Sequence, residues 1–366
     1  MKDRSVWYRI FCIVILIIPL DALAQWNIQS VSQVTPTVRQ YEKNVFAITV
    51  TGSFTNPYDE NDISLDAVLT SPSSKTLHFP CFYVSGDGIS SQWQARITLR
   101  EAGTYSGQFE LKKNGVLKST FALTDLNSEA TAKDGFIQKK DNWSFQFDSG
   151  KPFRGIGENV AWEGRSWEPD NYTYDYFLTK LANSGVNYFR TWSSAWNLPL
   201  EWKTVVDTKR YMNSTSYYHQ QGAARLDELV DLCESKNLFM MLTLGWHGEL
   251  QTGDRWNINV YNTANGGPAA TPTEFFTAAQ AKKQYQNRLR YIIARWGYSP
   301  SIASIEFFNE IDNAVYNGTE STIAIPHNVV TQWHDDMSTY MKNNDPYNHL
   351  LTTSVSHREI TGLFNV

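Results

Sequence analysis

The sequence predicts a multidomain protein, with an all-β sandwich followed by an incomplete α/β TIM barrel. Residues 26–125 contain short alternating strands and no segment with helical period. After Lys151, strands and helices alternate, which is typical of a parallel sheet. Only five such strand–helix units fit before residue 366, whereas a complete (β/α)8 barrel has eight strands and about 250 residues. The chain is therefore expected to be a fragment.

The chain divides into four segments. Residues 1–24 are expected to be a signal peptide, 25–125 the sandwich, 126–150 a linker hairpin, and 151–366 the first five units of the barrel. Composition agrees with folded domains, because 42% of the residues are hydrophobic and 19% are charged, which excludes a disordered chain.

The first segment has the three parts of a secretory signal. Lys2, Arg4 and Arg9 precede the apolar run Ile10–Leu20, and small residues end the segment at Ala24. The apolar run is too short to span a bilayer as a helix, and no later stretch is long and apolar enough. We therefore expect a secreted or periplasmic protein with no membrane span in the mature chain.

Four runs in the sandwich region alternate or are apolar throughout, and Lys113-Asn114-Gly115 follows the last of them as a hairpin turn. The four predicted strands are residues 46–51, 64–70, 92–99 and 104–111. A second hairpin, with the turn Asp148-Ser149-Gly150, is expected within residues 134–153.

The barrel region is predicted to contain five strands, at residues 153–157, 186–192, 238–244, 302–308 and 349–355. Helical spacing of apolar residues predicts helices between them, at 176–184, around 226–233, at 281–296 and around 330–341. An open doubly wound sheet is the alternative. However, Gly155-Ile-Gly157 continues as Glu158-Asn159-Val160, so the last glycine of its phosphate loop is missing.

Polar and aromatic residues stand at the carboxyl ends of these strands, where barrel active sites lie. They suit sugar binding and acid catalysis, because aromatic faces stack on sugar rings and polar groups bind hydroxyls. The candidates are Glu158, Asn159, Trp162, Arg190, Trp192, Trp246, His247, Asn309 and Glu310. Further aromatic residues occur in polar loop sequence: Trp167, Trp196, Trp202, Tyr217, Tyr218 and Trp256.

Glu310 is the candidate general acid. It follows an apolar strand with no turn residue between, so we expect it over the barrel mouth, where burial would raise its pKa. The alternative is a carboxylate at a helix start, satisfied by the following turn.

Residues 285–312 closely resemble clan A glycoside hydrolases near family 5. In that family, a helix with the pattern Arg-Tyr-x-x-x-Arg-Trp-Gly, here residues 290–297, leads to a strand ending in Asn-Glu. The resemblance implies that Glu310 is the acid/base and that Asn309 holds the sugar 2-hydroxyl. It further implies that Arg190 supports the nucleophile, and that Trp246 and His247 line the substrate.

The amino-terminal region resembles the β-sandwich that precedes such barrels in bacterial polysaccharide-degrading enzymes. The motifs are Asn56-Pro57-Tyr58, Trp93–Arg96 and Ala102–Tyr105.

The resemblance thus implies a retaining hydrolase of β-linked poly- or oligosaccharides. The nucleophile of clan A enzymes lies on strand seven, so it is expected outside this chain, which should be inactive alone. A non-catalytic carbohydrate-binding protein on the same barrel is the alternative.

We expect no cofactor and no metal site, because the seven histidines have no paired zinc-ligand spacing. Binding of nucleic acid is not expected either, because the formal net charge is −5.

Overall fold

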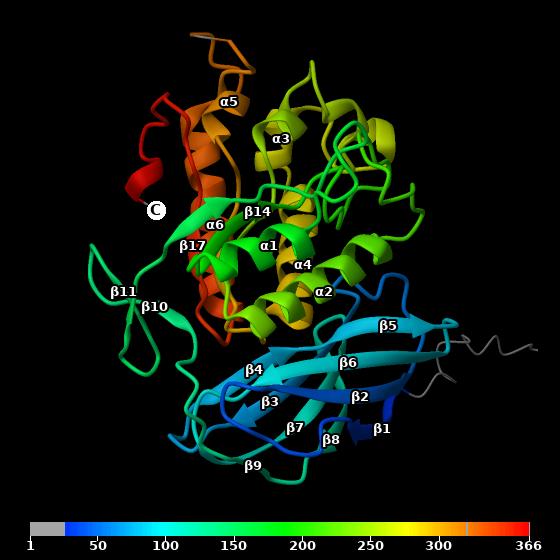
Figure 1. Cartoon of the computed structure of the whole chain (residues 1–366). Helices are drawn as coiled ribbons and strands as arrows, with labels where there is room; N and C mark the ends of the chain where they lie inside the picture. Colours follow the sequence, from blue (N-terminus) through cyan, green and yellow to red (C-terminus); the bar gives the residue numbers. More distant parts are fainter. Residues whose placement is uncertain (1–25, 320, 366) are drawn as a thin grey trace, which may run out of the picture.

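The computed structural model describes residues 26–319 and 321–365, and the expected signal peptide lies outside them. An antiparallel β domain comes first and is followed by a parallel α/β region, which confirms the predicted fold class. In Figure 1 the β domain lies below the α/β region. Within the described residues, no helix is long and apolar enough to cross a membrane.

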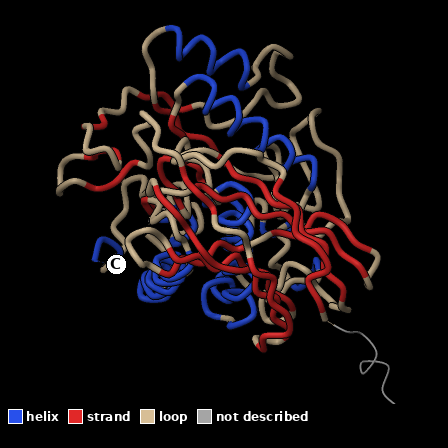
Figure 2. The backbone as a smooth tube through the Cα atoms, turned by 90° about the horizontal axis from the view of Figure 1, so that it is seen from below, coloured by secondary structure: helices blue, strands red, loops and turns tan. Residues whose placement is uncertain are grey.

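Two antiparallel sheets form the first domain, in the orders β1-β2-β6-β5 and β4-β3-β7-β8, with β9 paired to β7. They pack face to face, since Phe46 of one sheet contacts Phe109 of the other at 5.7 Å between ring centroids. Seen from below, these strands lie in front of most helices (Figure 2). The strands are β1 (Asn27–Gln33), β2 (Lys43–Thr51), β3 (Ile63–Thr70), β4 (Thr76–Pro80), β5 (Phe82–Gly86), β6 (Ser90–Thr98), β7 (Gly103–Lys113), β8 (Val116–Ala122) and β9 (Leu126–Ser128).

The predicted turn between β7 and β8 is confirmed. Asn114 and Gly115 both have positive φ angles, of 51° and 72°, which a two-residue hairpin of this twist requires.

A small three-stranded sheet follows, made of β10 (Ile137–Lys139), β11 (Phe145–Phe147) and β12 (Pro152–Phe153). The predicted turn at residues 148–150 joins its last two strands. Ile137 and Phe147 pack with Phe239 and Ala303, at the amino-terminal ends of two barrel strands. The hairpin therefore covers the end of the parallel sheet that is opposite to the predicted active site.

Five parallel strands pair in chain order, which is the arrangement of consecutive barrel units. They are β13 (Gly157–Asn159), β14 (Tyr188–Trp192), β15 (Phe239–Thr243), β16 (Ile302–Glu306) and β17 (Leu350–Thr352). The predicted first strand at 153–157 is wrong. Asn187 explains why: its side chain accepts a hydrogen bond from the Ile156 N–H (2.7 Å) and donates one to the Arg154 carbonyl (3.0 Å), in place of a strand ladder.

The helices that cover this sheet include the four that the sequence predicts. The α-helices are α1 (Tyr174–Asn183), α2 (Gln220–Lys236), α3 (Pro272–Thr277), α4 (Ala279–Trp296), α5 (Ile311–Val315) and α6 (His327–Asn344). Helices α3 and α5 were not predicted, because neither is long enough to show helical period.

Helices α2 and α4 connect the parallel sheet to the sandwich (Figure 1). Asp227 on α2 accepts hydrogen bonds from Arg96 of β6 (2.6 Å), from Arg295 of α4 (2.7 Å) and from the Trp296 indole (2.7 Å). Burial opposes ionisation of this carboxylate, but the hydrogen bonds from Arg295 and Arg96 hold its pKa below the usual range. One ionised side chain thus joins three elements of the two domains.

We expect Asp227→Asn to lower the free energy of unfolding by about 2–3 kcal/mol, because two arginines lose a partly buried partner. Asp231→Asn is the matched control on the same helix. Asp231 also pairs with the sandwich, through Lys43, but its side chain is 61% exposed, so its loss should cost less than about 1 kcal/mol. Urea unfolding of both variants checks this; equal losses would contradict the account of the interface.

Candidate active site

The carboxyl ends of β14, β15 and β16 bring polar side chains together on one face of the sheet. Trp192, Thr243 and Glu306 are neighbours in the strand register, so their side chains lie side by side. Arg190 lies on the same face, two residues before Trp192.

Glu306 is a site residue that was not predicted from the sequence. Its side chain is only 2% exposed, and its Oε2 accepts hydrogen bonds from Arg190 Nε and from Thr243 Oγ1, both at 2.6 Å. A buried carboxylate requires such partners. The sequence does contain a signal for a buried functional carboxylate, because Glu306 is a charged residue inside an apolar strand, four positions before Glu310.

Arg190 also orients Asn309. Its Nη2 donates to Asn309 Oδ1 at 2.8 Å, which turns the Asn309 amide so that the oxygen faces the arginine. Within the described part of the chain, Asn309 Nδ2 has no hydrogen-bond partner, although the residue is buried. The amide N–H₂ is therefore available to a ligand.

Glu310 directly precedes α5 in a left-handed conformation, with φ 52° and ψ 51°. This conformation is uncommon for a residue other than glycine and is found at functional sites. Its main-chain N–H donates to Ser354 Oγ (3.0 Å), and Asn313 Nδ2 donates to its Oε2 (3.2 Å). The expected burial is wrong: the side chain is 41% exposed, because the turn directs it outward.

Trp246 and His247 lie beside this turn. The loops after β15 and β16 are joined by two backbone hydrogen bonds, from His247 N–H to the Asn309 carbonyl (3.2 Å) and from Asn309 N–H to the Gly245 carbonyl (2.9 Å). His247 Nδ1 lies 3.6 Å from Glu310 Oε2. Burial lowers the pKa of His247, although the Glu310 carboxylate opposes this shift.

Glu249 is a buried residue that stabilises the loop after β15. Its Oε1 accepts a hydrogen bond from the Trp246 N–H at 2.8 Å. Burial raises the pKa of Glu249 to about 8, with Arg288 of α4 opposing the shift. Arg288 in turn pairs with Glu201 at 3.2 Å. A Cβ atom at Gly245 would overlap the Glu249 carboxylate and the Phe308 ring, so a larger residue there would force both side chains to move.

Four tryptophans form a contiguous group, here called the tryptophan cluster: Trp162, Trp192, Trp196 and Trp246. Their ring centroids are 5.2–6.4 Å apart in successive contacts. Three other loop aromatics, Trp202, Tyr218 and Trp256, are buried, and Trp202 packs against the same cluster as Trp196, which is equally buried. The polar sequence around these aromatic residues therefore did not predict which of them belong to the tryptophan cluster.

The two candidates on β13 lie on opposite faces of the sheet. Asn159 is the register partner of Arg190 and shares its face. Glu158 pairs with Phe189, so its side chain belongs to the other face, where it borders a hollow lined also by Phe177 and Leu181 of α1. Glu158 thus shares this hollow with Asn159 and Trp162, but it does not lie on the face of the sheet that carries Arg190 and Glu306.

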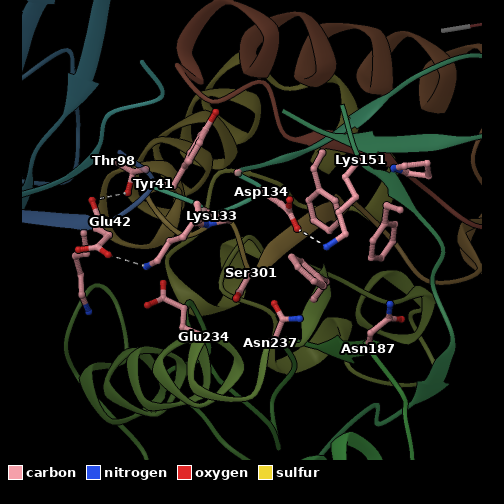
Figure 3. A pocket seen from close by; sticks show the side chains of 18 of the residues that line it. Tyr41, Glu42, Thr98, Lys133, Asp134, Lys151, Asn187, Glu234, Asn237 and Ser301 are labelled. Atoms are coloured by element: carbon pink, nitrogen blue, oxygen red, sulfur yellow. Dashed lines mark hydrogen bonds and ion pairs between the residues drawn. The ribbon is translucent and has the colours of Figure 1, made fainter. Parts of the chain in front are cut away.

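A cavity of about 560 Å³ lies at the opposite end of the sheet (Figure 3). Asn187, Asn237 and Ser301, which line it, stand at the amino-terminal ends of β14, β15 and β16. Its charged groups include two ion pairs, Lys133–Glu42 (3.3 Å) and Lys151–Asp134 (2.8 Å). The cavity and the polar residues of the candidate site therefore lie at opposite ends of the parallel strands.

Among residues 26–319 and 321–365, no group of three or more His, Cys, Asp or Glu side chains is arranged to hold a metal ion. The side chains gathered at the carboxyl ends are carboxylates, a guanidinium, an amide, an imidazole and aromatic rings.

Known proteins with similar sequences were found. Residues 148–359 match the family described as cellulase (glycosyl hydrolase family 5). "Probable mannan endo-1,4-beta-mannosidase C" of Aspergillus terreus is 28% identical over 237 residues, which are 60% of this chain and 54% of that protein. Mannan endo-1,4-beta-mannosidase A of Podospora anserina is 27% identical over 200 residues, which are 54% of this chain and 48% of that protein. The chain spans about half the length of these curated relatives.

A solved structure has the same fold. A protein from Bacteroides vulgatus ATCC 8482, described as a "putative glycoside hydrolase", has a TM-score of 0.60 at 14% identity, over 90% of this chain and 58% of that chain. The parallel α/β region agrees with the barrel of the matched family, and the family match covers more than half of the chain. The chain therefore belongs to glycosyl hydrolase family 5.

Proposed function

We propose that the protein is a retaining glycoside hydrolase that acts on β-linked polysaccharides or oligosaccharides, with β-mannan as the favoured substrate. The observation that carries this proposal is the pair Asn309 and Glu310 at the end of β16, with Asn309 oriented by Arg190. The mannosidase names of the curated relatives support the choice of mannan.

In this proposal Glu310 acts twice. As an acid, it protonates the glycosidic oxygen of the leaving sugar, and as a base it then takes a proton from the attacking water. Its 41% exposure gives substrate and water access to the carboxyl group. The unpartnered N–H₂ of Asn309 donates to the sugar 2-hydroxyl, next to the reacting carbon.

The nucleophile is proposed to come from sequence outside this chain. A retaining enzyme needs a second carboxylate about 5–5.5 Å from the first. Three buried carboxylates at this end are already engaged: Glu306 by Arg190, Glu249 by the Trp246 N–H, and Asp312 by backbone N–H groups of residues 356–358. None of these three is available to attack a sugar.

Export is part of the proposal, because residues 1–24 read as a secretory signal. We expect a mature amino terminus at Gln25 and a protein outside the cytoplasm. Mass spectrometry of the protein from cell fractions checks both points, and an exported protein that retains residues 1–24 would contradict them.

Glu310→Gln, made in the complete product of the gene, should reduce hydrolysis of substrates with poor leaving groups by about 10²–10⁴-fold. Activated aryl β-mannosides need no protonation, so they should still form the glycosyl-enzyme. Azide, which attacks without a base, should restore turnover of that intermediate. Steady-state kinetics with and without azide measures both effects.

Glu129→Gln on the sandwich surface is the control and should leave kcat unchanged. Equal loss on all substrates without azide rescue would overturn the role of Glu310. The 366-residue chain alone should not turn over any glycoside, and robust hydrolysis by it would overturn the need for an external nucleophile. Binding without turnover by the complete gene product would favour the carbohydrate-binding alternative.

A further inference from the structure

Buried nitrogen atoms without partners gather at the tryptophan cluster. Of the buried side-chain nitrogens in the described ranges that lack a hydrogen bond, five lie in or beside this cluster: Arg165 Nε, Trp192 Nε1, Trp196 Nε1, Trp246 Nε1 and His247 Nδ1, the last of them 3.6 Å from the Glu310 carboxylate. The indole and guanidinium groups can only donate. Since most buried donors in proteins are paired, this concentration points to a bound partner that is rich in acceptors.

Arg165 carries the positive charge of this group. Its guanidinium carbon lies 4.4 Å from the ring centroid of Trp162 and 4.3 Å from that of Trp196, so it contacts both indoles, whose planes are 81° apart. Among the residues that the structure describes, no carboxylate lies within 4.0 Å of its guanidinium nitrogens.

The nearest acidic groups have other partners. Glu168 accepts the backbone N–H of Arg165 at 2.6 Å, and Asp207 pairs with Arg255 at 3.0 Å. Burial lowers the pKa of Arg165, and the attraction of Asp207 and Glu168 does not offset this shift. The guanidinium is thus a partly desolvated cation without a paired anion.

Arg165 is linked to the candidate acid by a continuous row of rings. Trp162 contacts Trp192 (5.4 Å between centroids), Trp192 stacks with Trp246 (6.4 Å), and Trp246 contacts His247 (5.1 Å). His247 lies 3.6 Å from Glu310. A glycan that reaches Glu310 along these aromatic faces would bring another of its sugar units to Arg165.

We propose that Arg165 and the neighbouring indole N–H groups bind the carboxylate of a uronic-acid unit of the β-linked glycan. This inference rests on the proposed function, because it assumes that the glycan binds at the carboxyl ends of the strands. Sugar hydroxyls could satisfy the indoles, but they carry no charge with which the guanidinium could form an ion pair. A carboxylate also accepts two parallel hydrogen bonds from arginine.

The test is calorimetric titration of the complete product of the gene with two matched ligands, in the Glu310→Gln background so that the ligands are not cleaved. One is a β-1,4-linked tetrasaccharide that carries one glucuronic-acid unit, and the other is the same tetrasaccharide after reduction of its carboxyl group. We expect the acidic ligand to bind about tenfold more tightly at low salt, which is the size of one charge-assisted contact. The preference should shrink as salt rises.

Variants assign the preference to Arg165. Arg165→Gln should abolish it, and Arg165→Lys should keep part of it, because lysine retains the charge without the planar fork. Arg154→Gln is the control, because it removes an exposed arginine that lines the cavity at the opposite end of the sheet. It should leave the preference unchanged.

The outcomes separate this inference from the proposed function. Measurable binding of both ligands with equal affinity would overturn the acidic-sugar inference and leave the glycan site intact. Binding of neither ligand would overturn both. The comparison of the two ligands in the Glu310→Gln background alone decides the question even if an Arg165 variant fails to fold.

Discussion

The ion pair between Arg190 and Glu306 is the interaction on which the candidate site depends. Glu306 points into the face that the barrel strands share, where it is almost fully buried, and an unpaired charge there would cost several kcal/mol. Arg190 and Thr243 come from the two preceding strands, so the pairing holds the carboxyl ends of β14, β15 and β16 together. A second guanidinium nitrogen of Arg190, Nη2, donates a hydrogen bond to Asn309 and so holds it beside Glu310.

A second set of contacts supports the site from outside the sheet. Arg288 of α4 donates to the Leu244 carbonyl and pairs with Glu201, beneath the loop that carries Trp246 and His247. The same helix carries the Arg-Tyr-x-x-x-Arg-Trp-Gly pattern. There, Arg290 pairs with Asp66 of the sandwich at 2.7 Å and Arg295 pairs with Asp227. The motif residues thus hold the sandwich against the barrel region, whereas the site is built at the strand ends.

The sequence predicts the elements better than it predicts the site. Alternation and helical period locate most long strands and helices, and the end of the fourth barrel strand leads directly to Asn309 and Glu310. The left-handed turn at Glu310, and hence its exposure, could not be predicted, because no glycine or proline marks it. The face of Glu158 depends on the pairing of a three-residue strand, which contains too few residues to show alternation. The role of Glu306 depends on a partner 116 residues away.

The most direct test of this account is a double-mutant cycle on glycan affinity. Glu306→Gln, Asn309→Ala and the double variant are titrated with a neutral β-1,4-linked manno-oligosaccharide, after circular dichroism has verified that each is folded. If Glu306 acts through Arg190 on Asn309, the loss in the double variant should be smaller than the sum of the single losses by about 0.5–3 kcal/mol. Strictly additive losses in three folded variants would contradict the claim that this ion pair positions Asn309 for the sugar.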